Sequence, residues 1–159
     1  MPRRKVTYRE GDWIALPLVR RGGWALGLIA RCKAPTIIGY FFGPRRSEPP
    51  TMTDTAKLSA RDALYVGDVG DLGLLDGNWQ VIGHQPAFDR TDWPMPLFTT
   101  VDGPRLYLCT MNEEDPGQIL HMERITPEEA ERRGAVRHIT HGHLALSLTL
   151  DKLLAEREA

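Results

Sequence analysis

The fold is decided by residues 24–33, which read WALGLIARCK. The even positions (Trp24, Leu26, Leu28, Ala30 and Cys32) are all apolar, and the odd positions become polar at Arg31 and Lys33. Side chains of a β-strand alternate between its two faces, so this pattern predicts a strand with one face on a core. Gly27 in the middle predicts a bulge or a sharp bend, which a small closed barrel requires.

The flanking segments extend this strand into a three-stranded unit. Residues 12–18 (DWIALPL) predict a preceding strand, in which Pro17 cannot donate to a ladder and therefore marks an edge or an end. Glycines 22 and 23 predict the turn between the two strands. Residues 36–43 (TIIGYFFG) predict the third strand. Short strands with tight turns favour a curled antiparallel sheet or an SH3-like partial barrel.

Farther along the chain, residues 44–56 predict an unpacked loop, and strands are expected at 63–66 and 78–83. A hairpin is expected over 98–110, followed by an acidic loop at 112–117 and a strand at 118–125. The motif Thr126-Pro127-Glu128-Glu129 is typical of a helix start, and a second helix is expected over 142–156. In that helix Leu146, Leu150, Leu153 and Leu154 form the apolar stripe, and Asp151 should face water.

Taken together, these elements predict a β-rich α+β fold. We expect one domain over residues 1–159, with a β-rich core at about 5–125 and a helical part at about 126–157. One or two C-terminal helices close or back the sheet.

Composition excludes several classes of protein. Apolar residues make up 42% of the 159 residues and charged residues 26%, which excludes a disordered tail or a coiled coil. No run of about 18 apolar residues occurs, so we expect no segment that spans a membrane.

The basic N-terminus is not followed by an apolar segment, which predicts a cytoplasmic location. The two cysteines, Cys32 and Cys109, are expected to be buried free thiols.

Motifs for catalysis are absent from the sequence. No P-loop, GxSxG or GxGxxG pattern occurs, and no pair of carboxylates stands out for acid–base chemistry. His138, His141 and His143 could ligate a metal, but no Cys or Glu stands beside them at a ligand spacing. We therefore interpret them as a polar linker and expect no enzyme activity, no metal and no cofactor.

Two kinds of residue are candidates for contacts with a partner. The first is a set of carboxylates in acidic loops, which could steer and bind a basic protein: Asp68, Asp71, Asp76, Glu113, Glu114 and Asp115. The second is Trp93 in a proline-rich segment, which is either an interface anchor or a core residue. A net charge of −1 argues against nucleic acid, although arginine doublets keep an SH3-like nucleic-acid- or peptide-binding module as the alternative. The oligomeric state is left open.

Three stretches resemble the immunity protein 26 family of bacterial polymorphic-toxin systems. They are residues 11–18 (GDWIALPL), 23–30 (GWALGLIA) and 76–83 (DGNWQVIG), and the resemblance covers about residues 6–98. The matched residues are expected to be structural: Gly11, Asp12, Trp13, Pro17, Trp24, Gly27, Trp79 and Gly83. The resemblance implies a cytoplasmic antidote that binds and neutralises a cognate toxin. Together with the missing catalytic motifs and the acidic loops, it leads us to expect a non-catalytic protein that occludes the active surface of a toxin encoded nearby.

Overall fold

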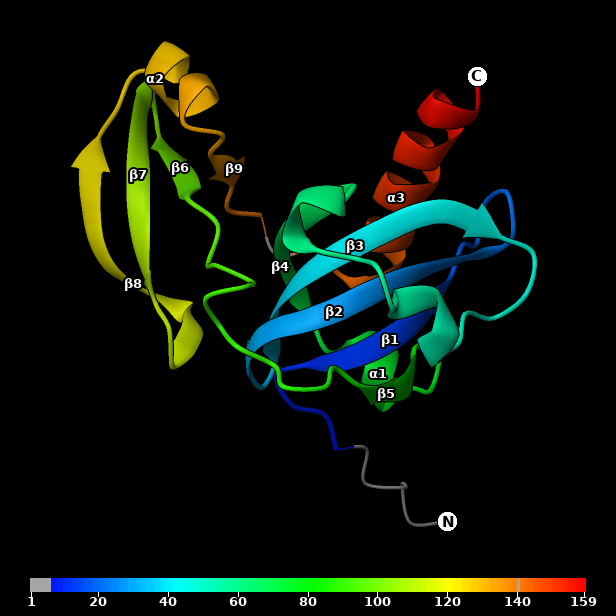
Figure 1. Ribbon diagram of the computed structural model, residues 1–159. Coiled ribbons are helices and arrows are strands. Elements are labelled where there is room, and N and C mark those ends of the chain that lie inside the picture. Colours follow the sequence, from blue (N-terminus) through cyan, green and yellow to red (C-terminus); the bar gives the residue numbers. More distant parts are fainter. Residues whose placement is uncertain (1–6, 140) are drawn as a thin grey trace.

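The computed structural model describes residues 7–139 and 141–159, which form two β-sheets, two short helices and one long helix (Figure 1). The first sheet has the strand order β4-β3-β2-β1-β5 and is antiparallel throughout. Its strands are β1 (Asp12–Pro17), β2 (Trp24–Lys33), β3 (Thr36–Arg46), β4 (Tyr65–Gly70) and β5 (Gln80–His84).

The second sheet has the order β8-β7-β6-β9, in which only the β6–β9 pair is parallel. Its strands are β6 (Phe98–Asp102), β7 (Arg105–Asn112), β8 (Asp115–Arg124) and β9 (Val136–Arg137). The α-helices are α1 (Leu72–Leu75), α2 (Pro127–Arg132) and α3 (His143–Glu158), and two 3₁₀ turns are η1 (Met52–Thr55) and η2 (Ala60–Asp62). The predicted β-rich α+β class is confirmed.

Strand β2 has the predicted bounds, but both of its faces are buried rather than one. Leu26, Leu28 and Ala30 pack with Trp13 on one side of the sheet. Ala25 and Ile29 pack under helix α3 on the other side. The sequence suggested a single core face because Arg31 and Lys33 made the odd positions look polar. Arg31 is in fact only 2% exposed.

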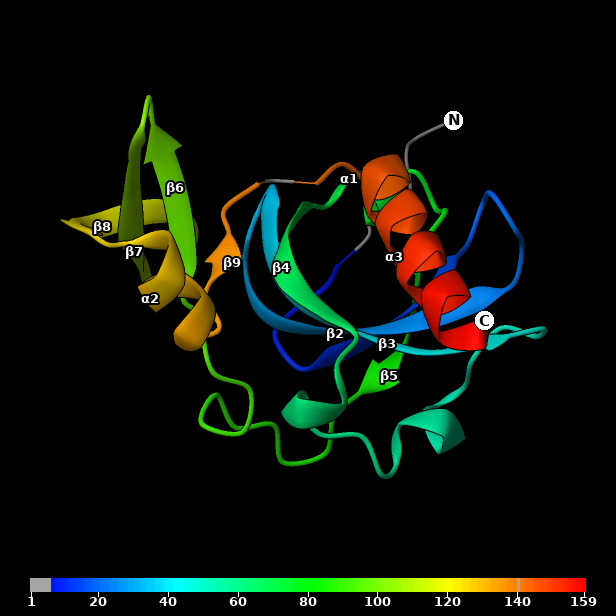
Figure 2. The same cartoon turned by 90° about the horizontal axis from the view of Figure 1, so that it is seen from above.

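The first sheet curls without closing into a barrel, and helix α3 lies across one of its faces (Figure 2). Gly27 itself carries no bulge, because it pairs in register with Ile14 and Phe41. The register of β2 with β3 shifts on either side of it, between Trp24 and Leu26 and between Ile29 and Arg31. A Cβ at Gly27 would lie 2.9 Å from the Phe41 ring and 3.0 Å from Ile14. The glycine therefore makes room for the Phe41 ring.

The segment after β3 is more ordered than predicted. Strand β3 continues to Arg46, and η1 falls inside the stretch 44–56 that was expected to be an unpacked loop. Arg46 pairs with Asp54 at 3.0 Å, and Met52 packs against the core around Trp13. Pro17 ends β1, which lies inside the sheet between β2 and β5 and not at its edge.

The residues that carried the family resemblance hold this sheet together. Gly11 has a φ of +90°, and a Cβ there would lie 2.7 Å from His84. Asp12 faces His84 at 3.0 Å and is 7% exposed. The Trp79 ring packs directly against Gly73 of α1. Gly83 leaves the space that the Met52 side chain fills, while Trp24 pairs with Pro17 at the turn-side end of β2.

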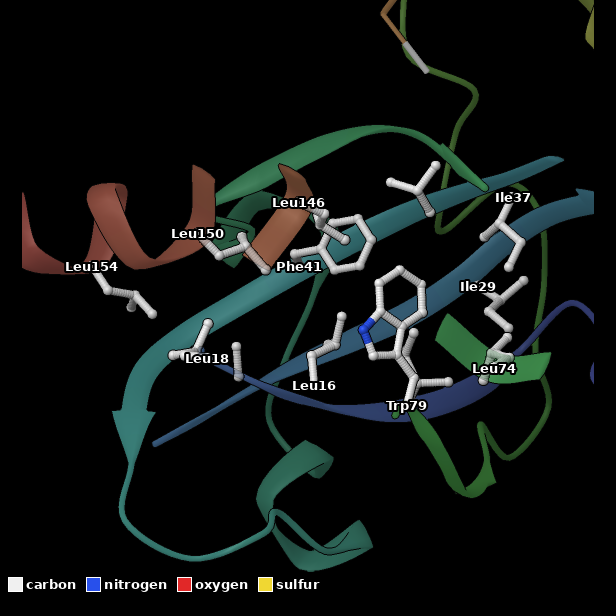
Figure 3. Packing of buried hydrophobic residues seen from close by; sticks show 13 residues of the cluster. Leu16, Leu18, Ile29, Ile37, Phe41, Leu74, Trp79, Leu146, Leu150 and Leu154 are labelled. Atoms are coloured by element: carbon white, nitrogen blue, oxygen red, sulfur yellow. The ribbon is translucent and has the colours of Figure 1, made fainter. Parts of the chain in front are cut away.

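The C-terminal helices follow their sequence signals closely. The Thr126 hydroxyl accepts a hydrogen bond from the Glu129 N–H at 3.2 Å and caps α2. Leu146, Leu150 and Leu154 of α3 are at most 2% exposed. Figure 3 shows Leu146 and Leu150 beside Phe41, and Leu154 on the side of Leu18. No helix in the described ranges combines the length and apolar character that crossing a membrane requires.

Asp151 of α3 does not face water as predicted. Its side chain is 1% exposed, and it accepts hydrogen bonds from the Arg45 guanidinium and, at 2.8 Å, from the Arg21 N–H. Burial opposes ionisation, but these hydrogen bonds outweigh it and hold the pKa of Asp151 below its usual value. The helical pattern could not show this pair because Arg45 comes from the distant strand β3.

Candidate partner-binding surface

Two of the six candidate carboxylates lie inside the fold. Asp68 in β4 is 1% exposed and faces His138 at 3.3 Å. Asp71 is 5% exposed and accepts a hydrogen bond from the Tyr8 hydroxyl at 2.6 Å. Burial and this hydrogen bond raise the pKa of Tyr8. The description of Asp68 and Asp71 as part of a solvated acidic loop is therefore wrong, and neither offers its carboxylate to a partner's surface.

The acidic turn, Glu113 and Glu114, lies between β7 and β8 and is bound by two arginines. The Arg31 Nε donates to Glu113, while its Nη1 donates to the carbonyls of Ala30 and Trp93 at 2.7 and 3.0 Å. Arg90 donates to Glu114 at 2.7 Å and to Glu10 at 2.7 and 2.9 Å. Hydrogen bonds from Arg90 hold the pKa of Glu114 below its usual value. These ion pairs fasten the end of the second sheet to the first.

Asp115 and Asp76 lie in different places. Asp115 begins β8 and accepts a hydrogen bond from the Gly117 N–H at 3.3 Å, so the predicted acidic loop over 112–117 is a tighter turn. Asp76 is exposed at the end of α1, and its carboxylate lies 3.6 Å from His143. Of the six candidates, Asp76, Glu113 and Glu114 are exposed and Asp115 is half-buried.

Trp93 is a core residue in this structure. It is 4% exposed, and its ring contacts Trp13, Tyr40 and Phe42 in edge-to-face arrangements. The Tyr40 hydroxyl donates to the Pro94 carbonyl, so the proline-rich segment is held across the outer face of the first sheet. Of the two interpretations of Trp93, the packing supports the core tryptophan.

The histidines of the linker point to separate partners. His138 faces Asp68, His143 faces Asp76, and His141 lies with its ring 5.5 Å from that of Tyr65. Within residues 7–139 and 141–159, no cluster of three or more His, Cys, Asp or Glu side chains has the geometry to hold a metal ion. The three histidines therefore contact different residues and do not converge on one point.

Neither cysteine forms a disulfide. Cys109 is buried, and Cys32 is only half-buried, which differs from the expectation. Burial, together with the nearby Glu10 and Asp12, raises the pKa of Cys32 to about 11, and burial raises the pKa of Cys109. Both thiols are therefore protonated near neutral pH.

The outer strand β8 carries an apolar patch that the sequence did not single out. The β8 patch consists of Ile119, Leu120 and Met122, which are 37%, 59% and 40% exposed. The ladder between β8 and β7 skips Leu120. On β7, the consecutive residues Thr110 and Met111 pair with His121 and Ile119 of β8, and Cys109 pairs with Met122. Because of this bulge, Ile119 and Met122 share the face of Cys109 and Met111. A regular strand would place residues three apart on opposite faces.

The β8 patch continues a buried cluster out to solvent. Cys109 and Met111 pack with Ile38 and Phe98 between the two sheets. Ile119 and Met122 lie beside them on the same face, at the edge of the sheet. In the described part of the chain β8 pairs only with β7, so its outer edge bears no strand (Figure 1). Exposed apolar edges of this kind are typical of protein interaction sites.

Comparison with known proteins gives one match. The family model described as Immunity protein 26 matches residues 9–106, well over half of the chain. The matched segment ends early in β7, so β8, α2, β9 and α3 lie outside it. No curated protein and no solved structure matches the chain.

Proposed function

Because the chain belongs to the immunity protein 26 family, we propose that it binds a cognate bacterial toxin in the cytoplasm and neutralises it by occluding the toxin's active surface. The family match is the observation that carries this proposal. The protein acts as a stable binding partner and breaks no bond of its own. Its proposed contacts include the exposed carboxylates Glu113 and Glu114 and the half-buried Asp115.

The alternative, an SH3-like module for nucleic acid or peptide, has less support. The first sheet does not close into a barrel. Both arginines of the 45–46 doublet are engaged with carboxylates: Arg45 with Asp151 and Glu158, and Arg46 with Asp54. A guanidinium that is already paired contributes little to nucleic-acid binding, in which free cationic side chains neutralise phosphates and release the counterions of the nucleic acid.

The test is a rescue experiment with the toxic domain encoded beside this gene. Bacteria that express that domain should die, and co-expression of this chain should restore growth. The two purified proteins should form a stoichiometric complex, in which the toxin's activity is lost. If the chain neither rescues growth nor forms a complex, the proposed function is wrong.

A further inference from the structure

We propose that the toxin docks on the outer edge of β8 and on the acidic turn beside it. This site is apolar at its centre and acidic at its rim, and the toxin surface that fits it is apolar at its centre and basic at its rim. This inference rests on the proposed function and names the surface that performs it. The centre of the site is the β8 patch. The acidic rim is formed by Glu10 and Glu114, which bind Arg90, and by Asp89 and Asp92, which adjoin Arg90 along the chain.

The apolar centre is built by the bulge at Leu120. Without the bulge, Ile119 and Met122 would project from opposite faces of the sheet. With it, they share one face next to the cluster of Cys109 and Met111, and Leu120 lies between them with 59% of its surface exposed. Bulges are frequent where a strand re-aims its side chains for a function. An edge strand also offers unpaired N–H and C=O groups to an extended segment of a partner.

The acidic rim lies directly beside this centre. The Asn112 side chain donates to Gln118 at 2.8 Å, which joins the acidic turn to the start of the patch. Arg90 is flanked by Glu10 and Glu114 in space and by Asp89 and Asp92 along the chain. Glu10, Glu113 and Glu114 bind the guanidinium groups of Arg31 and Arg90, and Asp89 and Asp92 add negative charge next to Arg90 along the chain, so this rim is negative. A basic partner surface is the complement, and opposite charges at a rim speed the encounter of two proteins.

The site is also held in position before any partner arrives. The Arg31–Glu113 and Arg90–Glu114 pairs fix the acidic turn against the first sheet, and Arg31 is almost fully buried. A surface that is already ordered loses less conformational entropy on binding. The structure thus places a fixed apolar and acidic surface at one corner of the molecule.

A second exposed apolar group provides a matched control. Val19, Leu144 and Leu148 are 59%, 53% and 42% exposed beside the first turns of α3. Leu144 is the counterpart of Leu120 because both are exposed leucines. The substitution Leu144→Asp therefore makes the same chemical change at a distant place.

The experiment compares Leu120→Asp with Leu144→Asp, using the toxic domain encoded beside the gene as the probe. We expect Leu120→Asp to weaken the complex at least 100-fold and to abolish rescue, and Leu144→Asp to change the Kd less than threefold. Met122→Ser serves as a second, milder variant and should weaken binding about tenfold. Circular dichroism and thermal melts check that each variant is folded.

Two charge-reversal variants test the acidic rim. Asp92→Lys should slow association about tenfold at low salt, with the difference lost above about 0.5 M salt because the charges are then screened. Glu128→Lys, on the exposed start of α2, should leave the association rate unchanged. Equal effects of Asp92→Lys and Glu128→Lys would contradict the acidic rim.

The outcomes separate the inference from the proposed function. If the unaltered chain rescues cells but Leu120→Asp binds as well as Leu144→Asp, the docking surface is wrong and the function stands. If the unaltered chain binds no toxin, both the docking surface and the proposed function are wrong. If the free protein is a dimer that Leu120→Asp converts to a monomer while toxin binding is unchanged, the edge is occupied by a second copy, which also overturns the inference.

Discussion

Helix α3 lies outside the segment that matches the family, yet it completes the main core, and Leu150→Ala measures how much stability it provides. Leu150 is fully buried between α3 and the sheet. The substitution removes three carbon groups, worth roughly 0.8 kcal/mol each in transfer free energy. The cavity left behind adds to this, so we expect a loss of about 3–4 kcal/mol in the free energy of unfolding. For a chain of this size the melting temperature should fall by roughly 10 °C.

Leu148→Ala is the control on the same helix. Leu148 is 42% exposed, so its truncation should change the free energy of unfolding by no more than about 0.5 kcal/mol. Urea titrations followed by circular dichroism and tryptophan fluorescence measure both variants. If Leu150→Ala and Leu148→Ala unfold at the same urea concentration, α3 does not contribute to the core as described.

Three further predictions concern the interior. Asp151→Asn should lower the free energy of unfolding by about 1–3 kcal/mol at pH 7. Because the folded-state pKa of Asp151 is depressed, the unaltered chain should lose this stability as the pH falls below about 4. In unfolding titrations, the stability of the variant should therefore depend less on pH in the acid range. Gly27→Ala should lower the free energy of unfolding in urea by about 1–3 kcal/mol, because the added Cβ would press on the Phe41 ring. A Cβ at Gly142 would meet no atom within 4 Å, so Gly142→Ala should not cause a loss of this size. Cys32 and Cys109 should react with a thiol reagent at pH 7.5 far more slowly in the native protein than in urea; equally fast native reaction would contradict their raised pKa values.

Local patterns were enough to predict most of the strands. The alternation of residues 24–33 and the glycine turn before it predicted β2 with its observed bounds. The cap at Thr126 and the leucine stripe of α3 were equally local and were also confirmed. Each of these signals depends on neighbours within a few residues, which a single sequence displays directly.

What the sequence did not predict depends on residues that meet from distant parts of the chain. Asp151 is buried because Arg45 approaches from β3, 106 positions away. Glu113 stands in the sequence as an acidic residue without a neighbouring base, because its partner Arg31 is 82 positions away. The β8 patch depends on a bulge that exists only in the pairing of β8 with β7. Side-chain partners and strand register are set by tertiary packing, which sequence periodicity does not contain.

The skipped position in β8 adds one side chain to the strand without moving its neighbours. Removing Leu120 would make the ladder regular here and would leave Ile119 and Met122 two positions apart, on one face as before. Only the apolar side chain that the strand exposes most would be lost. A one-residue deletion at this point would therefore shorten the molecule's apolar edge while keeping the pairing that holds it.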